Sequence, residues 1–442
     1  MNLRGALDMY AGKAKELLER EGVSIWDKVV VSIGTTAFEA IILPGPVRED
    51  VIYLKLPNGY NLAVKVDRIK SIKKIATITP KYTLPKMLVT AREDLPEVSI
   101  IHCGGTIASR IEYTTGAVAP AFSAEELSNA IPELFSIIKP RLTMLFNIFS
   151  ENMTPKHWIE IAKTTYRELL SGAKSVIITH GTDTLHYSAA ALAFMLRNLK
   201  GPVVLTGAMR SSDRPASDAP TNLIASSIFA TKSDVGEPVI LMHGTPDDTC
   251  FFAHRGVRCI KLHSTRRDAF RSIGIPPIAR VDIREQKVDI LYPHHKKTTE
   301  IESELKAVFE PKTAIIFIYP GMPQDIIDSF TDRNYRGLVL VGTGLGHVPE
   351  YMFESIQRAI ENGIIVVMTT QCLLGGVYLD VYETGRKLKT LGVVSGRNML
   401  PHVAYIKLGW LLAQDIPEAE VKDLMGKNIT GEIVYQESPV YF

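Results

Sequence analysis

The chain has 442 residues, of which 46% are hydrophobic and 22% charged, and its formal net charge at pH 7 is +2. This length predicts two or three domains, and the composition is that of ordinary folded globular proteins. Because positive and negative charges nearly balance, the composition excludes a global attraction to nucleic acid or to a membrane surface.

Targeting and redox features favour a cytoplasmic protein. The first residues lack the apolar core and cleavage site of a signal peptide, and no later run reaches the roughly 18 apolar residues that a membrane helix needs. The four cysteines, at positions 103, 250, 259 and 372, show neither a C-x-x-C pair nor a zinc-type histidine spacing. We therefore expect no disulfide framework, no metal site and no membrane contact.

The N-terminal stretch predicts a small β-barrel. Residues 3–21 place apolar side chains on one helical face. Four short strand-like runs follow, at residues 28–32, 37–43, 51–56 and 60–66. Asn58-Gly59 lies between the last two runs, and this dipeptide is typical of a hairpin turn. We expect an opening helix and barrel over residues 1–75 and a proline-containing linker over residues 76–96.

This barrel carries a local excess of positive charge. Residues 1–90 hold fourteen Lys and Arg against nine Asp and Glu, a difference of five. Such a surface fits contact with RNA or with a protein partner. An ordinary solvated surface is the simpler interpretation, because no aromatic platform accompanies the charge.

Two expected strands end in hydroxyl and carboxylate side chains. Residues 98–102 and 175–179 are short, apolar, β-branched runs that predict buried strands. The first is followed by Gly104-Gly105-Thr106, and the second by His180-Gly181-Thr182-Asp183 and then by a helical pattern. In an open α/β sheet, ligands bind at the carboxyl ends of the strands. Thr and Asp before a helix are also common N-caps, so this pattern alone leaves both catalysis and capping open.

Strands and helices alternate along the rest of the chain, which predicts an α/β body of parallel sheets flanked by helices. Further strands are expected at residues 144–149, 202–207, 314–319, 337–342 and 364–369. The body divides into two expected lobes, residues 97–300 and 301–442.

Two other stretches are less specific. Residues 342–346 contain three glycines without the G-x-G-x-x-G spacing, and the chain has no G-x-x-x-x-G-K-[ST] motif. The sequence therefore shows no recognisable nucleotide-phosphate cradle. From Arg255 to Arg271, six Lys or Arg residues accompany a single acid, Asp268. This basic stretch either meets phosphates or forms a salt-bridged loop.

The two strand-end motifs resemble those of a known family. Residues 104–108 (Gly-Gly-Thr-Ile-Ala) and 180–184 (His-Gly-Thr-Asp-Thr) are similar to the signature motifs of the bacterial-type L-asparaginases, and the resemblance covers about residues 97–415. It implies that Thr106 is the nucleophile that attacks a side-chain carboxamide and releases ammonia. It also implies a second catalytic group that moves protons, made of Thr182, Asp183 and Lys261.

The same resemblance implies substrate contacts. Ser150 and Glu151 occupy the position where the family binds the α-carboxylate and amino group, and many relatives carry glutamine in place of this glutamate. Tyr113 resembles a lid tyrosine, and residues 110–122 form either a mobile lid or an ordinary surface loop. Asparagine and glutamine differ by one methylene, so both remain open as substrates.

The whole chain resembles the D-subunit of the archaeal glutamyl-tRNA(Gln) amidotransferases. The barrel, the motif Thr265-Arg266-Arg267-Asp268 and the tail at residues 423–433 carry this wider resemblance. It implies that a partner, the E-subunit, binds Glu-tRNA(Gln), activates its glutamate with ATP and Mg, and receives ammonia taken from asparagine or glutamine. The chain itself would use no cofactor, and it would form a dimer flanked by partner subunits.

Two other functions remain open. A free-standing asparaginase or glutaminase with an accessory barrel would hydrolyse amides vigorously on its own. A non-catalytic, RNA-binding scaffold would be unaffected by Thr106→Ala. The joint presence of Thr106, Thr182, Asp183 and Lys261 argues against the scaffold.

Overall fold

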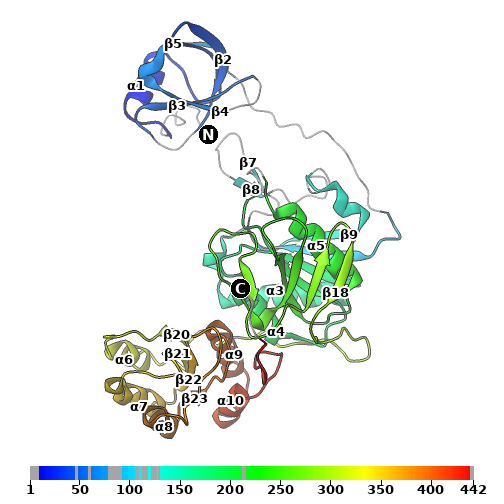
Figure 1. Ribbon diagram of the computed structural model, residues 1–442, viewed down its shortest axis with the longest axis vertical. Coiled ribbons are helices and arrows are strands. Elements are labelled where there is room, and N and C mark those ends of the chain that lie inside the picture. The colour runs from blue at the N-terminus through cyan, green and yellow to red at the C-terminus, as the bar shows by residue number, and fades with distance from the viewer. Residues whose placement is uncertain are drawn as a thin grey trace. The chain divides into compact units, whose positions relative to one another are not determined.

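The computed structural model describes residues 9–44, 48–57, 61–77, 92–105, 109–111, 118–120, 127, 130–211 and 216–438. The chain divides into two compact units (Figure 1). The smaller comprises residues 1–85 and 111–119, and the larger comprises residues 86–110 and 120–442.

In its described residues, the smaller unit contains one α-helix and a five-stranded antiparallel sheet in the order β4-β3-β2-β1-β5. Its strands are β1 (Asp27–Ile33), β2 (Thr36–Ile42), β3 (Val51–Lys55), β4 (Asn61–Lys65) and β5 (Ile69–Thr77). The helix, α1 (Gly12–Arg20), buries Leu17 and Leu18. These side chains share a hydrophobic core with Val29 and Val31. Every second residue of β1 points to the same face, so these two valines both lie on its inner face. The unit therefore has a core of its own.

The opening helix is shorter than expected. Among the described residues, Tyr10 and Ala11 are not helical, and α1 begins at Gly12. The Tyr10 hydroxyl donates to the carbonyl of Leu43 at 2.6 Å and accepts from the amide of Tyr53 at 3.1 Å. Tyr10 is thus bound to the sheet, and burial raises its pKa to about 12.

The sequence pattern does not predict β5, because lysines at positions 70, 73 and 74 interrupt its apolar alternation. β5 lies at the edge of the sheet, where lysine is common because it blocks pairing with other strands. The expected turn at Asn58-Gly59 and residues 78–91 of the expected linker lie outside the described residues. β3 and β4 nevertheless pair antiparallel, as a hairpin requires.

The larger unit contains an eight-stranded sheet in the order β18-β17-β14-β13-β12-β10-β6-β9. Its parallel strands are β6 (Glu97–His102), β9 (Lys139–Met144), β10 (Ser175–Thr179), β12 (Val203–Thr206) and β13 (Pro238–His243). The antiparallel extension consists of β14 (Phe251–Arg255), β17 (Ala279–Asp282) and β18 (Lys287–Ile290). β10, β12 and β13 are buried at every position, which is typical of a sheet covered on both faces.

Helices cover both faces of this sheet. α3 (Pro155–Leu170) and α4 (Leu185–Met195) share a core with Ile178 and Leu205. α5 (Ala219–Lys232) shares a second core with Ile177 and Val204, which point to the opposite face. The parallel, three-layered architecture expected from the alternating pattern is therefore present.

The expected strand at residues 144–149 is wrong. β9 ends at Met144, and the amides of Leu145 and Phe146 both donate to the carbonyl of His102, at 2.9 and 3.1 Å. The chain leaves the ladder at this point, and Phe146 packs edge-on against His157 of α3. The true strand is more polar because it lies at the edge of the sheet, whereas the apolar run lies beyond its end.

Residues after 312 form a second parallel sheet in the order β20-β21-β22-β23. Its strands are β20 (Thr313–Phe317), β21 (Gly337–Gly342), β22 (Ile365–Thr370) and β23 (Val394–Ser395). The helices here are α6 (Asp325–Asp332), α7 (Phe353–Glu361), α8 (Glu383–Leu391), α9 (Pro401–Leu412) and α10 (Glu418–Met425). Three of these strands coincide closely with those expected in this part of the chain.

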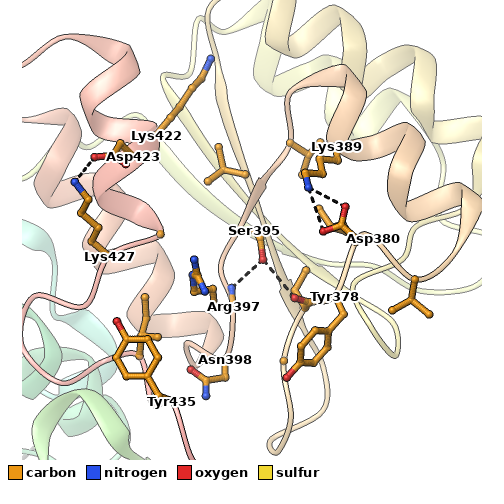
Figure 2. A pocket seen from close by; sticks show the side chains of 18 of the residues that line it. Tyr378, Asp380, Lys389, Ser395, Arg397, Asn398, Lys422, Asp423, Lys427 and Tyr435 are labelled. Atoms are coloured by element: carbon orange, nitrogen blue, oxygen red, sulfur yellow. Dashed lines mark hydrogen bonds and ion pairs between the residues drawn. The ribbon is translucent and has the colours of Figure 1, made fainter.

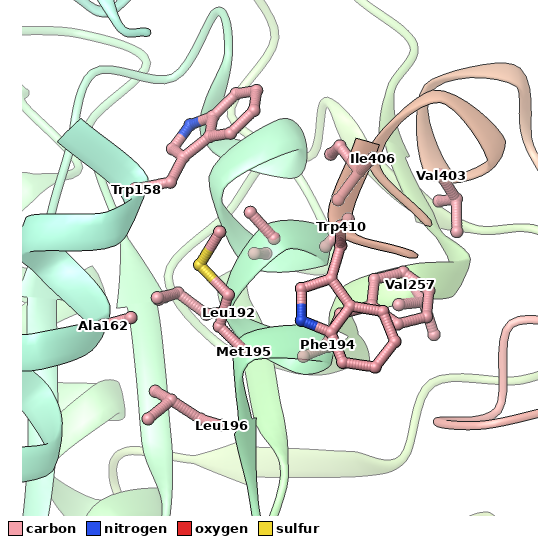
Figure 3. Close-up of a cluster of buried hydrophobic side chains, with 14 of the residues drawn as sticks. Trp158, Ala162, Leu192, Phe194, Met195, Leu196, Val257, Val403, Ile406 and Trp410 are labelled. Carbon is pink, nitrogen blue, oxygen red and sulfur yellow. The ribbon is translucent and has the colours of Figure 1, made fainter. Parts of the chain in front are cut away.

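α9 joins the second sheet to the first lobe. Figure 3 shows Trp410 of α9 beside Phe194 of α4, and their ring centroids lie 5.6 Å apart in a stacked arrangement. The same cluster of buried side chains contains Val339 of β21 and Val367 of β22. The two lobes therefore share one hydrophobic core.

Among the described residues, six short strands pair outside the main sheets. They are β7 (Ser109–Ile111) with β8 (Val118–Pro120), β11 (Leu196–Arg197) with β19 (Glu304–Leu305), and β15 (Cys259–Lys261) with β16 (Phe270–Ser272). In the part of the chain that the structure describes, every helix is too short or too polar to span a membrane.

Candidate active site

The carboxyl ends of β6, β10 and β12 meet at one edge of the large sheet. The amide of Cys103 donates to the carbonyl of Thr179 at 2.9 Å, and the amide of His180 donates to the carbonyl of Thr206 at 2.9 Å. The parallel hydrogen-bond ladder thus continues one residue past the end of β6 and one residue past the end of β10. The described start of the first strand-end motif, Gly104-Gly105, therefore lies beside the second motif, which begins at His180.

Glycine is required in the turn after β6. Gly104 and Gly105 have φ values of +110° and +81°, which L side chains rarely adopt. A Cβ on Gly105 would lie 2.9 Å from the amide nitrogen of Gly181, and one on Gly104 would overlap the carbonyl of Ile148. The backbone before Thr106 therefore packs directly on the turn after β10. Thr106 and Tyr113 themselves lie outside the described residues.

The structure brings Thr182, Asp183 and Lys261 together. The Lys261 ammonium donates to Oγ1 of Thr182 at 2.9 Å and to Oδ1 of Asp183 at 2.7 Å. Thr182 and Asp183 lie in the turn between β10 and α4, whereas Lys261 ends β15 and pairs with Phe270 of β16. A lysine, a hydroxyl and a carboxylate in contact can hold a proton and pass it between them.

Ser150 reaches the same turn from a different segment. It begins the short 3-10 helix η4 (Ser150–Asn152) and is buried. Thr184 donates its hydroxyl proton to the Ser150 carbonyl at 2.6 Å, and a Cβ on Gly181 would lie 2.9 Å from the Ser150 hydroxyl oxygen. Glu151 is exposed, and its carboxylate forms no ion pair within the described residues. Of Ser150 and Glu151, Ser150 is therefore the residue held against the site.

His180 stabilises the turn from the protein interior. Its Nδ1 lies 2.6 Å from the carbonyl of Gly181, and its Nε2 lies 2.9 Å from the hydroxyl of Ser188 in α4. Because a carbonyl can only accept, Nδ1 carries the proton and Nε2 accepts from Ser188. Burial lowers the pKa of His180 to about 4, so the ring is neutral at pH 7.

Sequence reasoning missed Asp218, which orders the loop after β12. This carboxylate is fully buried and accepts from the amides of Met209 and Arg210 at 2.9 and 2.8 Å, and from the side-chain amide of Asn222 at 3.0 Å. The loop packs on the site, because a Cβ on Gly207 would lie 2.9 Å from Cγ2 of Thr182. An Asp directly before a helix with proline in its first turn is a recognisable start signal, and it could have identified this residue.

The basic stretch from Arg255 to Arg271 forms a salt-bridged set of loops. Its ion pairs are Arg255 with Glu237, Lys261 with Asp183, Arg266 and Arg271 with Asp268, and Arg267 with Asp248. The remaining member, Arg258, is buried and donates to the carbonyls of Ile273 and Asn398. Of the two interpretations open from the sequence, the salt-bridged loop is the one that the structure contains.

The described part of the site offers no metal-binding cluster, and its one neighbouring thiol is unreactive. No group of three His, Cys, Asp or Glu side chains among the described residues is arranged to hold a metal ion. Cys103 precedes Gly104 but is fully buried, and burial raises the pKa of its thiol. The thiol is therefore protonated and a poor nucleophile.

Three known domain families match the chain. Residues 23–75 match the family described as GatD N-terminal domain. Residues 97–296 match the N-terminal asparaginase domain, and residues 312–425 match the glutaminase/asparaginase C-terminal domain.

Relatives that match over nearly the whole chain show in which larger protein these three domains occur together. The chain is 46% identical over 439 residues to the glutamyl-tRNA(Gln) amidotransferase D-subunit of Pyrococcus furiosus, covering 97% of this chain and 99% of that protein. It is also 46% identical over 436 residues to the D-subunit of Methanopyrus kandleri, covering 97% of this chain and 95% of that protein. The chain belongs to the D-subunit family of the glutamyl-tRNA(Gln) amidotransferases. The resemblance expected from the motifs is thereby confirmed.

Solved structures place the D-subunit family beside the asparaginases. The thermostable L-asparaginase from Thermococcus kodakarensis is 31% identical to this chain, with a TM-score of 0.68. The match covers 76% of this chain and 99% of the asparaginase chain. L-asparaginase I from Vibrio cholerae is 27% identical to this chain, with a TM-score of 0.67, and the match covers 77% of this chain and 99% of that protein. The expected fold is confirmed as an asparaginase-like α/β body with a strand-rich N-terminal domain.

Proposed function

We propose that the chain is the ammonia-releasing subunit of an amidotransferase that converts Glu-tRNA(Gln) to Gln-tRNA(Gln). The observation that carries this proposal is the contact of Lys261 with Thr182 and Asp183 at 2.9 and 2.7 Å, beside the Gly104-Gly105 turn. Near-complete coverage of relatives named as amidotransferase D-subunits supports the amidotransferase rather than a free-standing asparaginase.

The first chemical step is attack of the Thr106 hydroxyl oxygen on the amide carbon of asparagine or glutamine. A threonine hydroxyl is a weak nucleophile, so its proton must be removed as the new C–O bond forms. Thr182, Asp183 and Lys261 form the group that takes up this proton and returns it to the leaving nitrogen. The C–N bond then breaks, ammonia leaves, and an ester on Thr106 remains.

The second step is hydrolysis of that ester. Water adds to the carbonyl carbon, the bond to Thr106 breaks, and the free acid leaves as the hydroxyl regains its proton. The same lysine group serves both steps, since a proton donor in one direction is an acceptor in the other.

Substrate orientation is assigned to groups at the rim of the site. The exposed Asp183 carboxylate accepts the substrate's α-ammonium, and Ser150 with its neighbouring amides receives the α-carboxylate. Glu151 favours the ammonium by its charge and opposes the carboxylate. Tyr113 closes over the bound amide.

Transfer of the ammonia needs a partner. Amide formation requires an activated carboxylate, so the E-subunit would bind Glu-tRNA(Gln) and activate its glutamate with ATP and Mg. The assembly would be a dimer of this chain flanked by two partner subunits. Four free cysteines support a reducing, cytoplasmic location.

The test is ammonia release from asparagine and from glutamine by the purified chain, first alone and then with the E-subunit, Glu-tRNA(Gln), ATP and Mg. We expect weak release by the chain alone, a strong rise with the complete set, and loss of both activities in Thr106→Ala. High activity that is indifferent to the additions would instead identify a free-standing asparaginase or glutaminase.

A further inference from the structure

Two groups of charged side chains lie outside the Lys261 contact. One lines a cavity of about 770 Å³ in the C-terminal lobe, with walls from β23, α10 and residues 376–381 and 433–435 (Figure 2). The residues that line this cavity do not include Thr182, Asp183 or Lys261. The other group is centred on Arg267, which lies in the same β-hairpin as Lys261. The second group is therefore the one that can act on the proposed reaction.

Arg267 lies in the loop of the β15–β16 hairpin, whose first strand ends in Lys261. Its side chain is 21% exposed and reaches two neighbouring segments. Nη1 donates to Oδ1 of Asp248 at 3.2 Å, in the turn between β13 and β14. Nη2 donates to the carbonyl of Ala216, in the loop between β12 and α5. One guanidinium therefore joins the Lys261 hairpin to the loops that follow β12 and β13.

The hairpin can transmit a displacement of this loop to Lys261. The antiparallel pairing continues beyond Lys261, because the amide of Leu262 donates to the carbonyl of Ala269 at 2.8 Å. Asp268, which is buried, pairs with Arg266 at 2.6 Å and so braces the loop from within. The loop is thus a connected unit, and a change in its outer contacts would move the strand end that carries the lysine.

The two contacted loops are linked to Thr182 by a chain of side chains. Oδ1 of Asp248 lies 2.9 Å from Nε2 of His243, and Nδ1 of this ring lies 2.7 Å from Oδ1 of Asn222. Asn222 donates to the carbonyl of Gly207 at 2.9 Å. A Cβ on Gly207 would lie 2.9 Å from Cγ2 of Thr182. The contacts therefore run from the lysine hairpin to the hydroxyl partner of the lysine.

The protonation of His243 leaves Asp248 dependent on Arg267. The amide nitrogen of Asn222 donates to two other oxygens, so its oxygen faces His243 and Nδ1 of the ring is the donor. Burial lowers the pKa of His243, although the contact with Asp248 opposes this shift, and the ring is neutral at pH 7. Nε2 then has no proton to give to Asp248. The carboxylate keeps the hydroxyl of Thr221 at 3.4 Å and the guanidinium at 3.2 Å, of which only the guanidinium is charged.

We propose that Arg267 is a positioning residue that holds Lys261 in place against Thr182. It acts through Asp248 and the Ala216 carbonyl and does not touch the substrate. The inference rests on the proposed function, because it takes Lys261 as a group that moves protons in ammonia release. It gives a role to the motif at residues 265–268, which amide hydrolysis itself does not use.

The first test is ammonia release by the full chain, with kcat and KM determined separately for asparagine and glutamine. Arg267→Gln should lower kcat about tenfold or more and change KM much less, because a small displacement of a proton-transfer group is costly. Asp248→Ala should also lower kcat. The double variant should lose less than the product of the two single losses, since the two side chains form one link.

Arg336→Gln is the matched control. Like Arg267, Arg336 donates to one carboxylate and one main-chain carbonyl, those of Glu310 and Leu412, both at 3.0 Å. It lies directly before β21 in the C-terminal lobe, so its loss should leave kcat unchanged.

The pH dependence separates positioning from a contribution to stability alone. In acid His243 gains a second proton and can donate to Asp248, which replaces part of the link that Arg267→Gln removes. The ratio of wild-type to Arg267→Gln kcat should therefore fall between pH 8 and 5. This fall should disappear when His243→Gln is added to both chains. The groups that face the ring are Asp248, Asn222, Asp218, Arg267 and the ring of Phe251.

The outcomes are distinct. Wild-type kcat in Arg267→Gln, in an assay where Lys261→Met is inactive, would overturn the positioning role and leave the proposed function standing. A lower thermal midpoint with a kcat ratio that does not change with pH would also overturn it, because Arg267 would then act on stability alone. Absence of ammonia release by the wild type, both alone and with the E-subunit and Glu-tRNA(Gln), would overturn both proposals. If Arg267→Gln does not fold, Asp248→Ala carries the same measurements.

Discussion

The Lys261 ammonium lies 2.7 Å from the carboxylate of Asp183, although the two side chains are 9% and 68% exposed. One member of the pair faces the protein interior and the other faces solvent, from which an amide substrate arrives. The pair therefore connects the hydroxyl of Thr182 to an accessible charge.

Removing the lysine should abolish proton transfer without unfolding the chain. We expect Lys261→Met to lower the rate of ammonia release by about 100-fold or more, the range of a lost general acid or base. Lys163→Met is the control, because Lys163 forms a 3.2 Å ion pair with Glu160 on the exposed side of α3. It should retain full activity. Full activity in Lys261→Met would remove this lysine from the mechanism.

The close approach of the two strand-end turns can be tested with two glycines. Gly105→Ala should reduce both the thermal midpoint and the activity, because its φ is +81° and the new Cβ would lie 2.9 Å from the amide nitrogen of Gly181. Gly172→Ala has a similar φ of +102° but no atom within 4 Å of the new Cβ, so it should cost only the backbone strain, about 1 kcal/mol. Thermal melts and ammonia release measure both effects. Equal losses in the two variants would contradict the close packing.

Asp218 should matter for activity although it lies behind the loop that contacts Thr182. Asp218→Ala leaves the partly buried amides of Met209 and Arg210 without their acceptor, at a cost of about 1 kcal/mol for each hydrogen bond. We expect a lower thermal midpoint together with a reduced kcat. Asp282→Ala is the control, since this half-buried carboxylate at the end of β17 also accepts two backbone amides, and β14, β13 and β12 stand between β17 and β10 in the sheet. Its loss should leave kcat unchanged.

The ion pair of Lys407 and Glu432 is completely buried, with 2.6 Å between its charged atoms. Removing one partner of such a pair costs about 3–5 kcal/mol because the other charge is left uncompensated. Glu432→Leu should be more destabilising than Lys407→Met, because Glu432 also accepts the amides of Ile429 and Thr430. Urea unfolding of both variants measures the difference. The reverse order would show that the lysine, rather than the carboxylate, organises this segment.

Buried histidines should make the folded state sensitive to acid. Burial lowers the pKa of His180 to about 4 and that of His254 to about 3, from 6.5 in an unfolded chain. Below pH 6.5 the unfolded chain therefore binds protons that the folded chain does not, and the free energy of unfolding falls as the pH falls towards 4. His180 alone should contribute about 3 kcal/mol to this loss. Urea unfolding between pH 7.5 and 4 measures the slope, which His180→Gln should reduce.

Much of the fold follows from sequence periodicity, and the exceptions have a common physical cause. Buried strands such as β10 are uniformly apolar, so their pattern is unambiguous. β5 and β9 lie at sheet edges, where one side of the strand meets solvent and polar residues are favoured. Their sequences resemble loops, and the apolar run after β9 has the pattern of a buried strand although it is not one.

The candidate site also contains some residues that the sequence reveals and others that only the structure reveals. Motifs located Thr182 and Asp183 because hydroxyl and carboxylate groups at strand ends are recognisable along the chain. Lys261 comes from a different strand pair, and only the folded structure shows it 2.9 Å from Thr182. His180 and Asp218 act through backbone groups, and a sequence pattern does not reveal which amides a buried side chain will bind.

The core shared by α4 and α9 has a consequence for how such chains are assembled in evolution. The C-terminal lobe supplies Trp410 to a cluster that also contains Phe194, so a gene encoding only the first lobe would give a product with bare aromatic surface. The strand-rich unit closes its own core around Val29 and Leu18. We therefore expect that gene fusion or deletion can add or remove that unit as a module, whereas the two catalytic lobes depend on each other for a closed core.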